Sequence, residues 1–154
     1  MIQYQAKISK SHDSYTVIFP DLPGCFTQGE TLEEAIKMAK EALTLFLEEA
    51  RNPNWEIPKA KDRHGKNYHW IIPELEVAIP LMIRQKRLDA GLTQQKLAKK
   101  LEIPFQQLQK LETPRKSNPT VQTLEKISEA LNGKLEVNLI INSHRTSIKK
   151  MPTA

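Results

Sequence analysis

Glutamine and lysine side chains are concentrated in one short stretch, residues 93–112, with the sequence TQQKLAKKLEIPFQQLQKLE. A glutamine amide can form two hydrogen bonds with the edge of an adenine, and a lysine can reach a guanine or a phosphate. The second half of the stretch adds a phenylalanine, which can contact the methyl group of thymine. These residue types predict contacts with the major groove of DNA.

Two short helices joined by a tight turn are needed to present these side chains. Thr93 is a good N-cap for the first helix, and the turn falls at Glu102 and Ile103. Pro104 suits the first turn of the second helix, where its missing N–H is not needed. The inward apolar positions predicted by the helical period are Leu97, Ala98, Leu101, Leu108 and Leu111.

The flanking segments extend the helical pattern. Residues 81–90 predict a helix with Ile83 and Leu88 inward, and Gly91 can form its left-handed C-terminal cap. Thr120 can cap a further helix through Leu131, which Asn132 and Gly133 close; its predicted inward residues are Val121, Leu124, Ile127 and Leu131.

The run from Arg87 to Leu131 resembles the Cro and cI repressor type of helix-turn-helix family, through Gly-Leu-Thr-Gln at 91–94, Leu97-Ala98, Leu111-Glu112 and the entry into the last helix. The resemblance implies phosphate contacts from Gln94, Arg115 and Lys116. We assign Gln106, Gln109 and Lys110 to base edges, and Phe105 either to thymine methyl groups or to packing within its own domain. Gln95 and Gln107 complete the candidate DNA-binding set. Glu102 replaces the family's turn glycine, and the recognition helix begins Pro-Phe instead of with two polar residues.

The two halves of the chain carry opposite charge. Residues 1–80 hold 9 Lys and Arg against 12 Asp and Glu, a net of −3, whereas residues 81–154 hold 14 against 6, a net of +8. The basic half contains the predicted helix-turn-helix, as attraction to phosphates requires.

The acidic half predicts a small α+β domain. Alternating apolar residues in 2–9 and 15–19 indicate a hairpin with one buried face, and 25–28 a short third strand. Thr31 and Glu34 form a capping box for a helix with an apolar stripe of Leu32, Ala35, Ile36, Ala39, Leu43, Phe46, Leu47 and Ala50. Residues 70–72 and 75–79 supply a further strand before Pro80. The helix must cover one face of the sheet, which leaves the other face open.

Residues 19–43, FPDLPGCFTQGETLEEAIKMAKEAL, resemble the HicB antitoxin family of type II toxin-antitoxin systems. The resemblance implies an N-terminal domain with a truncated ribonuclease H-like fold beside an all-α DNA-binding domain. It also implies an antitoxin that masks HicA, a small RNA-cleaving toxin, and represses its own operon.

A toxin that binds RNA should be basic, so the acidic domain would attract it. The candidate toxin-binding carboxylates are Asp21, Glu30, Glu33, Glu34, Glu48 and Glu49. We expect no catalytic residues, because a two-metal nuclease needs three or four clustered carboxylates that hold two ions about 4 Å apart, whereas Asp13 and Asp21 lie in separate loops. No metal or other cofactor is expected, since the histidines are scattered and Cys25, the single cysteine, more readily packs as a small apolar residue.

Residues 135–141, LEVNLII, predict a strand after the last helix. Its backbone groups need a partner, either the same strand of a second chain across a two-fold axis or its own domain. A homodimer would place two recognition helices on half-sites about 34 Å apart. We therefore expect a toxin-binding domain at 1–79, a DNA-binding and dimerisation domain at 80–142 and a flexible tail at 143–154. No apolar run is long enough to span a bilayer and no signal peptide is evident, so we expect a cytoplasmic protein.

Three functions are compatible with the sequence. The first is an antitoxin that also represses its operon. The second is a transcription regulator that binds a small ligand on its open sheet face and has no toxin partner. The third is a nuclease, which predicts metal-dependent cleavage that is lost with Asp21.

Overall fold

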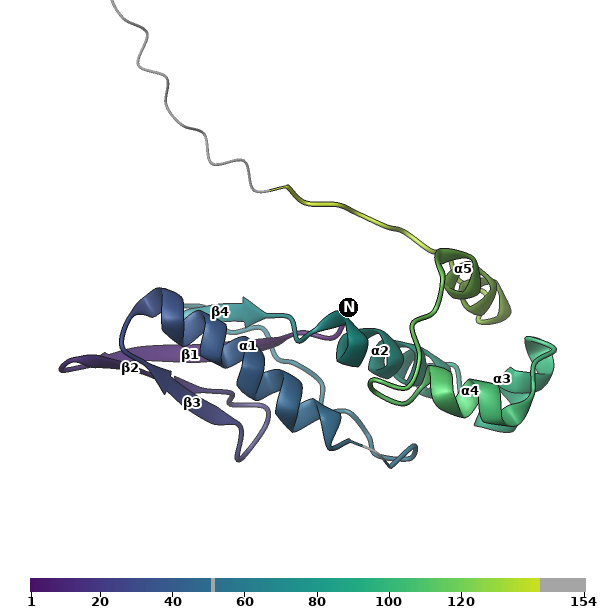
Figure 1. Cartoon of the computed structure of the whole chain (residues 1–154), viewed down its shortest axis with the longest axis horizontal. Helices are drawn as coiled ribbons and strands as arrows, with labels where there is room; N and C mark the ends of the chain where they lie inside the picture. The colour runs from purple at the N-terminus through teal and green to yellow at the C-terminus, as the bar shows by residue number, and fades with distance from the viewer. Residues whose placement is uncertain (51, 142–154) are drawn as a thin grey trace, which may run out of the picture.

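The computed structural model describes residues 1–50 and 52–141, so the tail predicted at 143–154 lies outside the described residues. Its elements follow in the order β1 (Tyr4–Ser11), β2 (Ser14–Ile18), β3 (Phe26–Gly29), α1 (Leu32–Glu48), β4 (Tyr68–Ile71), α2 (Leu75–Asp89), α3 (Gln94–Lys100), α4 (Phe105–Leu111) and α5 (Val121–Ala130). Figure 1 shows the sheet and α1 at one end of an elongated molecule, α3 to α5 at the other end and α2 between them. No helix in the described part is both long and apolar enough to cross a membrane.

The four strands form one antiparallel sheet in the order β3-β2-β1-β4. The hairpin register pairs Ile8 with Val17, both buried, so the alternating apolar residues lie on one face as predicted. The predicted third strand is also confirmed, one residue later than expected. The mixed architecture of a small sheet and several helices agrees with the predicted α+β class.

Helix α1 begins at the predicted N-cap Thr31, but the Glu34 carboxylate binds the N–H of Glu30 instead of the Thr31 N–H of a standard capping box. Thr31 Oγ1 accepts a hydrogen bond from the Glu34 N–H at 3.1 Å, and the Glu34 carboxylate accepts one from the Glu30 N–H at 2.8 Å. Most of the predicted apolar stripe is buried against the sheet: Ala35, Ala39, Leu43 and Leu47 are fully covered. Leu32 and Ile36, which belong to the predicted stripe, are 41% and 37% exposed and lie at the edge of this contact.

The strand predicted at residues 75–79 was wrong, because these residues form the first turns of α2. Their alternating apolar pattern resembled a strand, and Pro80 was taken as its end. In the structure Thr44 Oγ1 accepts a hydrogen bond from the Glu74 N–H at 3.0 Å, immediately before the helix, and Pro80 is buried inside it. Packing against α1 therefore overrides the local pattern.

Helix α2 contributes to both hydrophobic cores. Val77 and Leu81 pack with the sheet and α1, whereas Ile83 packs with Leu97 and Leu108 of the helical half. Residue 80, at which we divided the chain into two domains, lies near the middle of this shared helix. One continuous helix thus connects the two halves.

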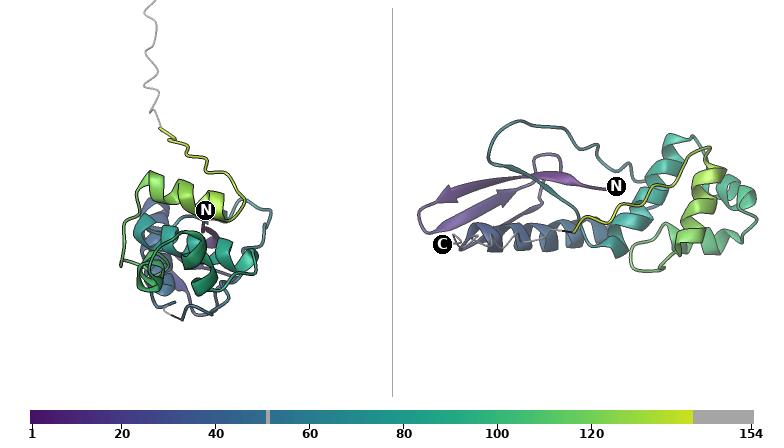
Figure 2. Two further views of the ribbon diagram at one scale, coloured as in Figure 1. Left: turned by 90° about the vertical axis from the view of Figure 1, so that its right-hand side faces the viewer. Right: turned by 90° about the horizontal axis from the view of Figure 1, so that it is seen from above.

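The segment after α5 leaves the helical core (Figure 1). Residues 135–141 form no strand in the described chain, and Val137, Leu139, Ile140 and Ile141 are between 63% and 91% exposed. Figure 2 shows the same extended trace from two further directions. The alternative in which this segment forms a strand packed on its own domain is contradicted.

Candidate functional site

The structure confirms the two-helix element predicted at residues 93–112. Thr93 caps α3, because its hydroxyl accepts a hydrogen bond from the Lys96 N–H at 3.2 Å. The turn passes through Glu102, whose φ of 54° is the left-handed conformation in which a glycine would be most comfortable. Pro104 is the N-cap of α4, one position earlier than expected. Leu97, Ala98 and Leu108 are buried, which turns most of the polar residues of both helices outward.

The outer face of α4 is polar and accessible. Gln106, Gln107, Gln109 and Lys110 are exposed, and so is Gln95 on α3. Phe105 differs from them because it is half-buried and lines a hollow with Leu92 and Gln94. The structure therefore places part of this ring against its own domain, while the four polar side chains remain available to a ligand.

Gln94 was predicted to bind phosphate, but its amide is engaged inside the protein. Its Nε2 donates to Glu112 Oε2 at 2.9 Å, and the side chain is half-buried. Glu112 lies at the C-terminal cap of α4, so this hydrogen bond joins the two helices. In the structure Gln94 is a residue that holds the motif together.

Arg115 was also predicted to bind phosphate, and it too has partners within the chain. Its Nε lies 2.9 Å from Glu48 Oε2, and its Nη1 lies 2.8 Å from Glu76 Oε2. These carboxylates raise the pKa of the guanidinium, with Glu48 as the main cause. Lys116 is exposed as well, and its side chain remains a candidate phosphate contact in this turn.

The predicted toxin-binding carboxylates fall into two groups. Asp21 is paired with Arg63, its oxygens lying 2.6 and 2.7 Å from the guanidinium nitrogens, and this contact holds the pKa of Asp21 below its usual value. Glu34 caps α1 and Glu48 binds Arg115, so these three carboxylates are committed to intramolecular contacts. Glu30, Glu33 and Glu49 form the second group because they are exposed, although Glu49 also interacts within the chain.

Two side chains that we considered for catalysis, Cys25 and Asp21, are engaged within the protein. Cys25 is buried, as expected of a packed apolar residue, and burial raises the pKa of its thiol to about 11. Asp21 lies against an arginine instead of a second carboxylate. Within residues 1–50 and 52–141, no three histidine, cysteine or acidic side chains are grouped as a metal site.

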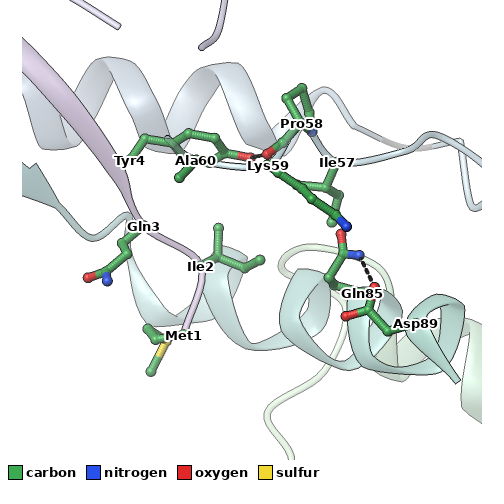
Figure 3. Close-up of a pocket in the computed structure, with 10 residues that line it drawn as sticks. All are labelled: Met1, Ile2, Gln3, Tyr4, Ile57, Pro58, Lys59, Ala60, Gln85 and Asp89. Atoms are coloured by element: carbon green, nitrogen blue, oxygen red, sulfur yellow. Dashed lines mark hydrogen bonds between the residues drawn. The ribbon is translucent and has the colours of Figure 1, made fainter. Parts of the chain in front are cut away.

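A hollow of about 330 Å³ lies where the start of β1, residues 57–60 and α2 meet (Figure 3). Asp89 is the one carboxylate among its lining side chains, and it already accepts a hydrogen bond from Gln85 at 2.8 Å. The lining therefore offers no pair of carboxylates for acid and base catalysis.

Comparisons with known proteins agree with this arrangement. Residues 4–99 match the model of the HicB-like antitoxin of bacterial toxin-antitoxin systems, and residues 83–138 match a helix-turn-helix model. The chain belongs to the HicB-like antitoxin family. Antitoxin HicB 1 of Photorhabdus laumondii subsp. laumondii is 32% identical over 125 residues, which cover 81% of this chain and 78% of that protein. Antitoxin HicB of Escherichia coli (strain K12) is 34% identical over 97 residues, or 63% of this chain and 70% of that protein.

Among solved structures, a HicA3 and HicB3 toxin-antitoxin complex contains a similar chain, with a TM-score of 0.39 and 25% identity. The match covers 47% of this chain and 99% of that chain.

In this HicB-family chain the two sequence matches overlap at residues 83–99, the end of α2 and nearly all of α3. The overlap contains Arg87, which with Arg84 was missed by the sequence analysis. Both arginines are buried and bind Glu112; Arg84 lies three positions after Leu81 and Arg87 four positions after Ile83, so each shares a helix row with a buried apolar residue. The sequence did contain a sign of their role, because two arginines stand at positions where the helical period predicts apolar residues.

Proposed function

We propose that this chain neutralises a HicA-type RNA-cleaving toxin through its N-terminal half and represses its own operon through its helix-turn-helix. The observation that carries the proposal is the presence, in one chain, of a HicB-like match and of a helix-turn-helix whose recognition helix has an exposed glutamine and lysine face. The proposal includes a truncated ribonuclease H-like fold for the N-terminal half, action in the cytoplasm and no enzymatic activity. Three antiparallel strands followed by a helix and a fourth strand are compatible with that fold.

Operator recognition is assigned to the accessible side chains of the motif. Gln106, Gln109 and Lys110 would read base edges in the major groove, and Lys116 would bind phosphate. Gln95 and Gln107 flank this set. The basic charge of the C-terminal half favours this docking because DNA binding gains from the release of counterions.

Toxin binding is assigned to the exposed carboxylates near the two ends of α1, namely Glu30, Glu33 and Glu49. A toxin that grips RNA must carry positive charge, and exposed carboxylates speed the encounter with such a partner. Charge and exposure support this assignment of the toxin-binding residues. Mapping the interface between the two proteins would identify the residues in contact.

A homodimer is part of the proposal because the segment 135–141 exposes apolar side chains and forms no strand within the described residues. The same segment of a second copy would cover these side chains when the two pair across a two-fold axis. The two recognition helices would then meet half-sites about 34 Å apart. Sedimentation of the full chain at micromolar concentration tests this: Leu139→Glu should give monomers, whereas a monomeric wild type would contradict it.

The DNA-binding proposal is tested by titrating the full chain with the DNA upstream of its own gene. Gln106→Ala should relax sequence preference, whereas Lys116→Ala should weaken binding to all sequences and reduce the salt dependence. Gln122→Ala, an exposed glutamine on α5, is the matched control and should bind as the wild type does. Unchanged operator affinity in both test variants would rule out the proposed docking.

The toxin-binding proposal is tested by co-expression with the product of the adjacent gene, followed by capture of the complex. A small basic RNA-cleaving partner should be recovered and inhibited. Its absence would favour the ligand-responsive regulator, in which a small molecule shifts operator affinity without a protein partner.

A further inference from the structure

The turn that follows the recognition helix is held by both halves of the molecule. Thr113 Oγ1 donates to the Gln109 carbonyl at 2.6 Å, and its N–H donates to the Lys110 carbonyl at 3.2 Å. The Lys116 N–H in turn donates to the Thr113 carbonyl at 3.2 Å. The backbone of two residues that we assign to DNA bases is thus connected directly to the turn that contains Arg115.

Arg115 connects that turn to α1 and α2 through ion pairs and a backbone hydrogen bond. Its side chain pairs with Glu48 at the end of α1 and with Glu76 in the first turn of α2. Its backbone N–H donates to the Glu76 carbonyl at 3.0 Å. Arg115 has a φ of 58°, a conformation that is unfavourable for a residue with a Cβ and persists only where neighbours enforce it.

Pro80 explains why the Glu76 carbonyl is available. In a regular helix this carbonyl would accept the N–H of the residue four positions later, which is residue 80. Proline has no N–H, so the acceptor is left open inside α2. The Arg115 N–H occupies it, and a helix-internal proline thereby becomes an attachment point for the loop after the recognition helix.

Arg84 makes a second connection between the same regions. This side chain is 1% exposed, and its Nη1 donates to the Ala50 and Asn52 carbonyls, just after α1, at 2.8 and 3.0 Å. Its Nη2 donates to the Glu112 carbonyl at the end of α4 at 2.9 Å. The C-terminal ends of α1 and α4 are therefore joined by two arginines.

We propose that Arg115 is a positioning residue for operator binding, which sets the recognition helix against the N-terminal half through Glu48 and Glu76 without contacting phosphate itself. The inference rests on the proposed DNA-binding function. It assigns two acidic residues of the N-terminal half a role in the affinity for an anionic ligand, which simple charge considerations would not predict.

The two roles for Arg115 predict effects of opposite sign in a variant that leaves Arg115 intact. If Arg115 is a positioning residue, Glu48→Gln with Glu76→Gln should raise the operator Kd about threefold to tenfold. If Arg115 binds phosphate, removing its two carboxylate partners frees the cation and lowers repulsion, so the operator Kd should fall or stay the same. Glu41→Gln with Glu56→Gln removes the same charge from exposed positions and is the matched control, with a Kd that does not rise.

Arg115→Asn supplies the second measurement, because asparagine tolerates the left-handed backbone. A positioning role leaves the slope of log affinity against log salt unchanged, whereas loss of a phosphate contact reduces the slope by about 0.9. A reduced slope, or a Glu48 and Glu76 double variant that binds as tightly as the wild type, would overturn the inference.

Amide hydrogen exchange gives a readout that does not depend on DNA. The Glu48 and Glu76 double variant should speed exchange of the Thr113 and Lys116 amides, and the Glu41 and Glu56 control should not. If the wild type bound no DNA, the proposed function would be wrong. Hydrogen exchange would still show whether Glu48 and Glu76 hold the turn that contains Arg115. Unchanged exchange at both amides would show that they do not.

Discussion

Arg87 and Glu112 form a buried ion pair at the centre of the helix-turn-helix, with 2.6 Å between Nε and Oε1 and side chains that are 3% and 0% exposed. Arg87 Nη2 also donates to Glu112 Oε2 at 2.8 Å, and Nη1 donates to the Leu92 carbonyl at 2.8 Å. Both carboxylate oxygens are therefore occupied, and three helices meet at one acidic side chain. The pair holds α2 and α4 in a fixed relation.

Glu112→Gln should lower the free energy of unfolding by about 3–5 kcal/mol, because a buried arginine then loses its counter-charge. Urea denaturation followed by circular dichroism measures the loss. Glu136→Gln breaks the exposed contact with Lys134 and should leave the urea midpoint unchanged. Equal midpoints for the two variants would mean that the buried pair does not stabilise the fold.

The Asp21 and Arg63 pair should make stability depend on acid pH. Arg63 lowers the pKa of Asp21 below its usual 3.8, so the folded state binds the proton less readily than the unfolded state. The contribution is fully present above pH 3.8 and is lost as the pH falls through the lower folded-state pKa. Asp21→Asn should therefore melt below the wild type at pH 7, and the difference between their melting temperatures should narrow under acid conditions. If the difference between the two melting temperatures stayed constant down to pH 2, the ion pair would not be the cause of the pH dependence.

Gly29→Ala should destabilise the N-terminal half. A Cβ at this position would lie 2.5 Å from the backbone nitrogen of Ala35, and the backbone of α1 cannot yield as a flexible side chain would. Overpacking of this kind costs about 1–3 kcal/mol. Gly133→Ala is the control, since its Cβ would meet the Ser128 carbonyl at 3.4 Å, an ordinary contact. Thermal melts of the two variants should separate clearly, and a wild-type melting temperature for Gly29→Ala would refute the close approach.

Glu102→Gly should stabilise the protein by about 0.5–1 kcal/mol, because glycine adopts the left-handed turn conformation without strain. A glycine introduced into a regular helix should have the opposite effect. Lys126→Gly, at an exposed position inside α5, should cost about 1 kcal/mol. Chemical denaturation of both variants measures the two changes in the free energy of unfolding, which should have opposite signs. A loss of stability in Glu102→Gly would contradict the strain argument.

Much of the candidate site follows from local sequence. Thr31, Thr93 and Thr120 each cap a helix as predicted, because an N-cap needs only a side chain and the N–H groups within the next three residues. The turn at Glu102 and the outward face of α4 were also readable, since helical spacing fixes which residues share a face.

Tertiary structure decided which polar residues are free. Asp21, Gln94 and Arg115 have the residue types of binding groups, yet their partners Arg63, Glu112 and Glu48 lie at least 18 positions away in sequence. Only the packing of separate elements brings such groups together, and no local period encodes it.

The sequence by itself determined the antiparallel hairpin, the amphipathic α1 and the two-helix motif, because each depends on periodicity and caps within a few residues. Residues 75–79 were decided by tertiary structure alone: their alternating pattern fits a strand, but Val77 and Ala78 are both buried in a helix, and Val77 packs in the core of the sheet and α1. Pro80 likewise combines a property of the sequence with one of the tertiary structure. Its missing N–H is a property of the residue, whereas the use of the open Glu76 carbonyl by Arg115 depends on how the folded chain brings the two together.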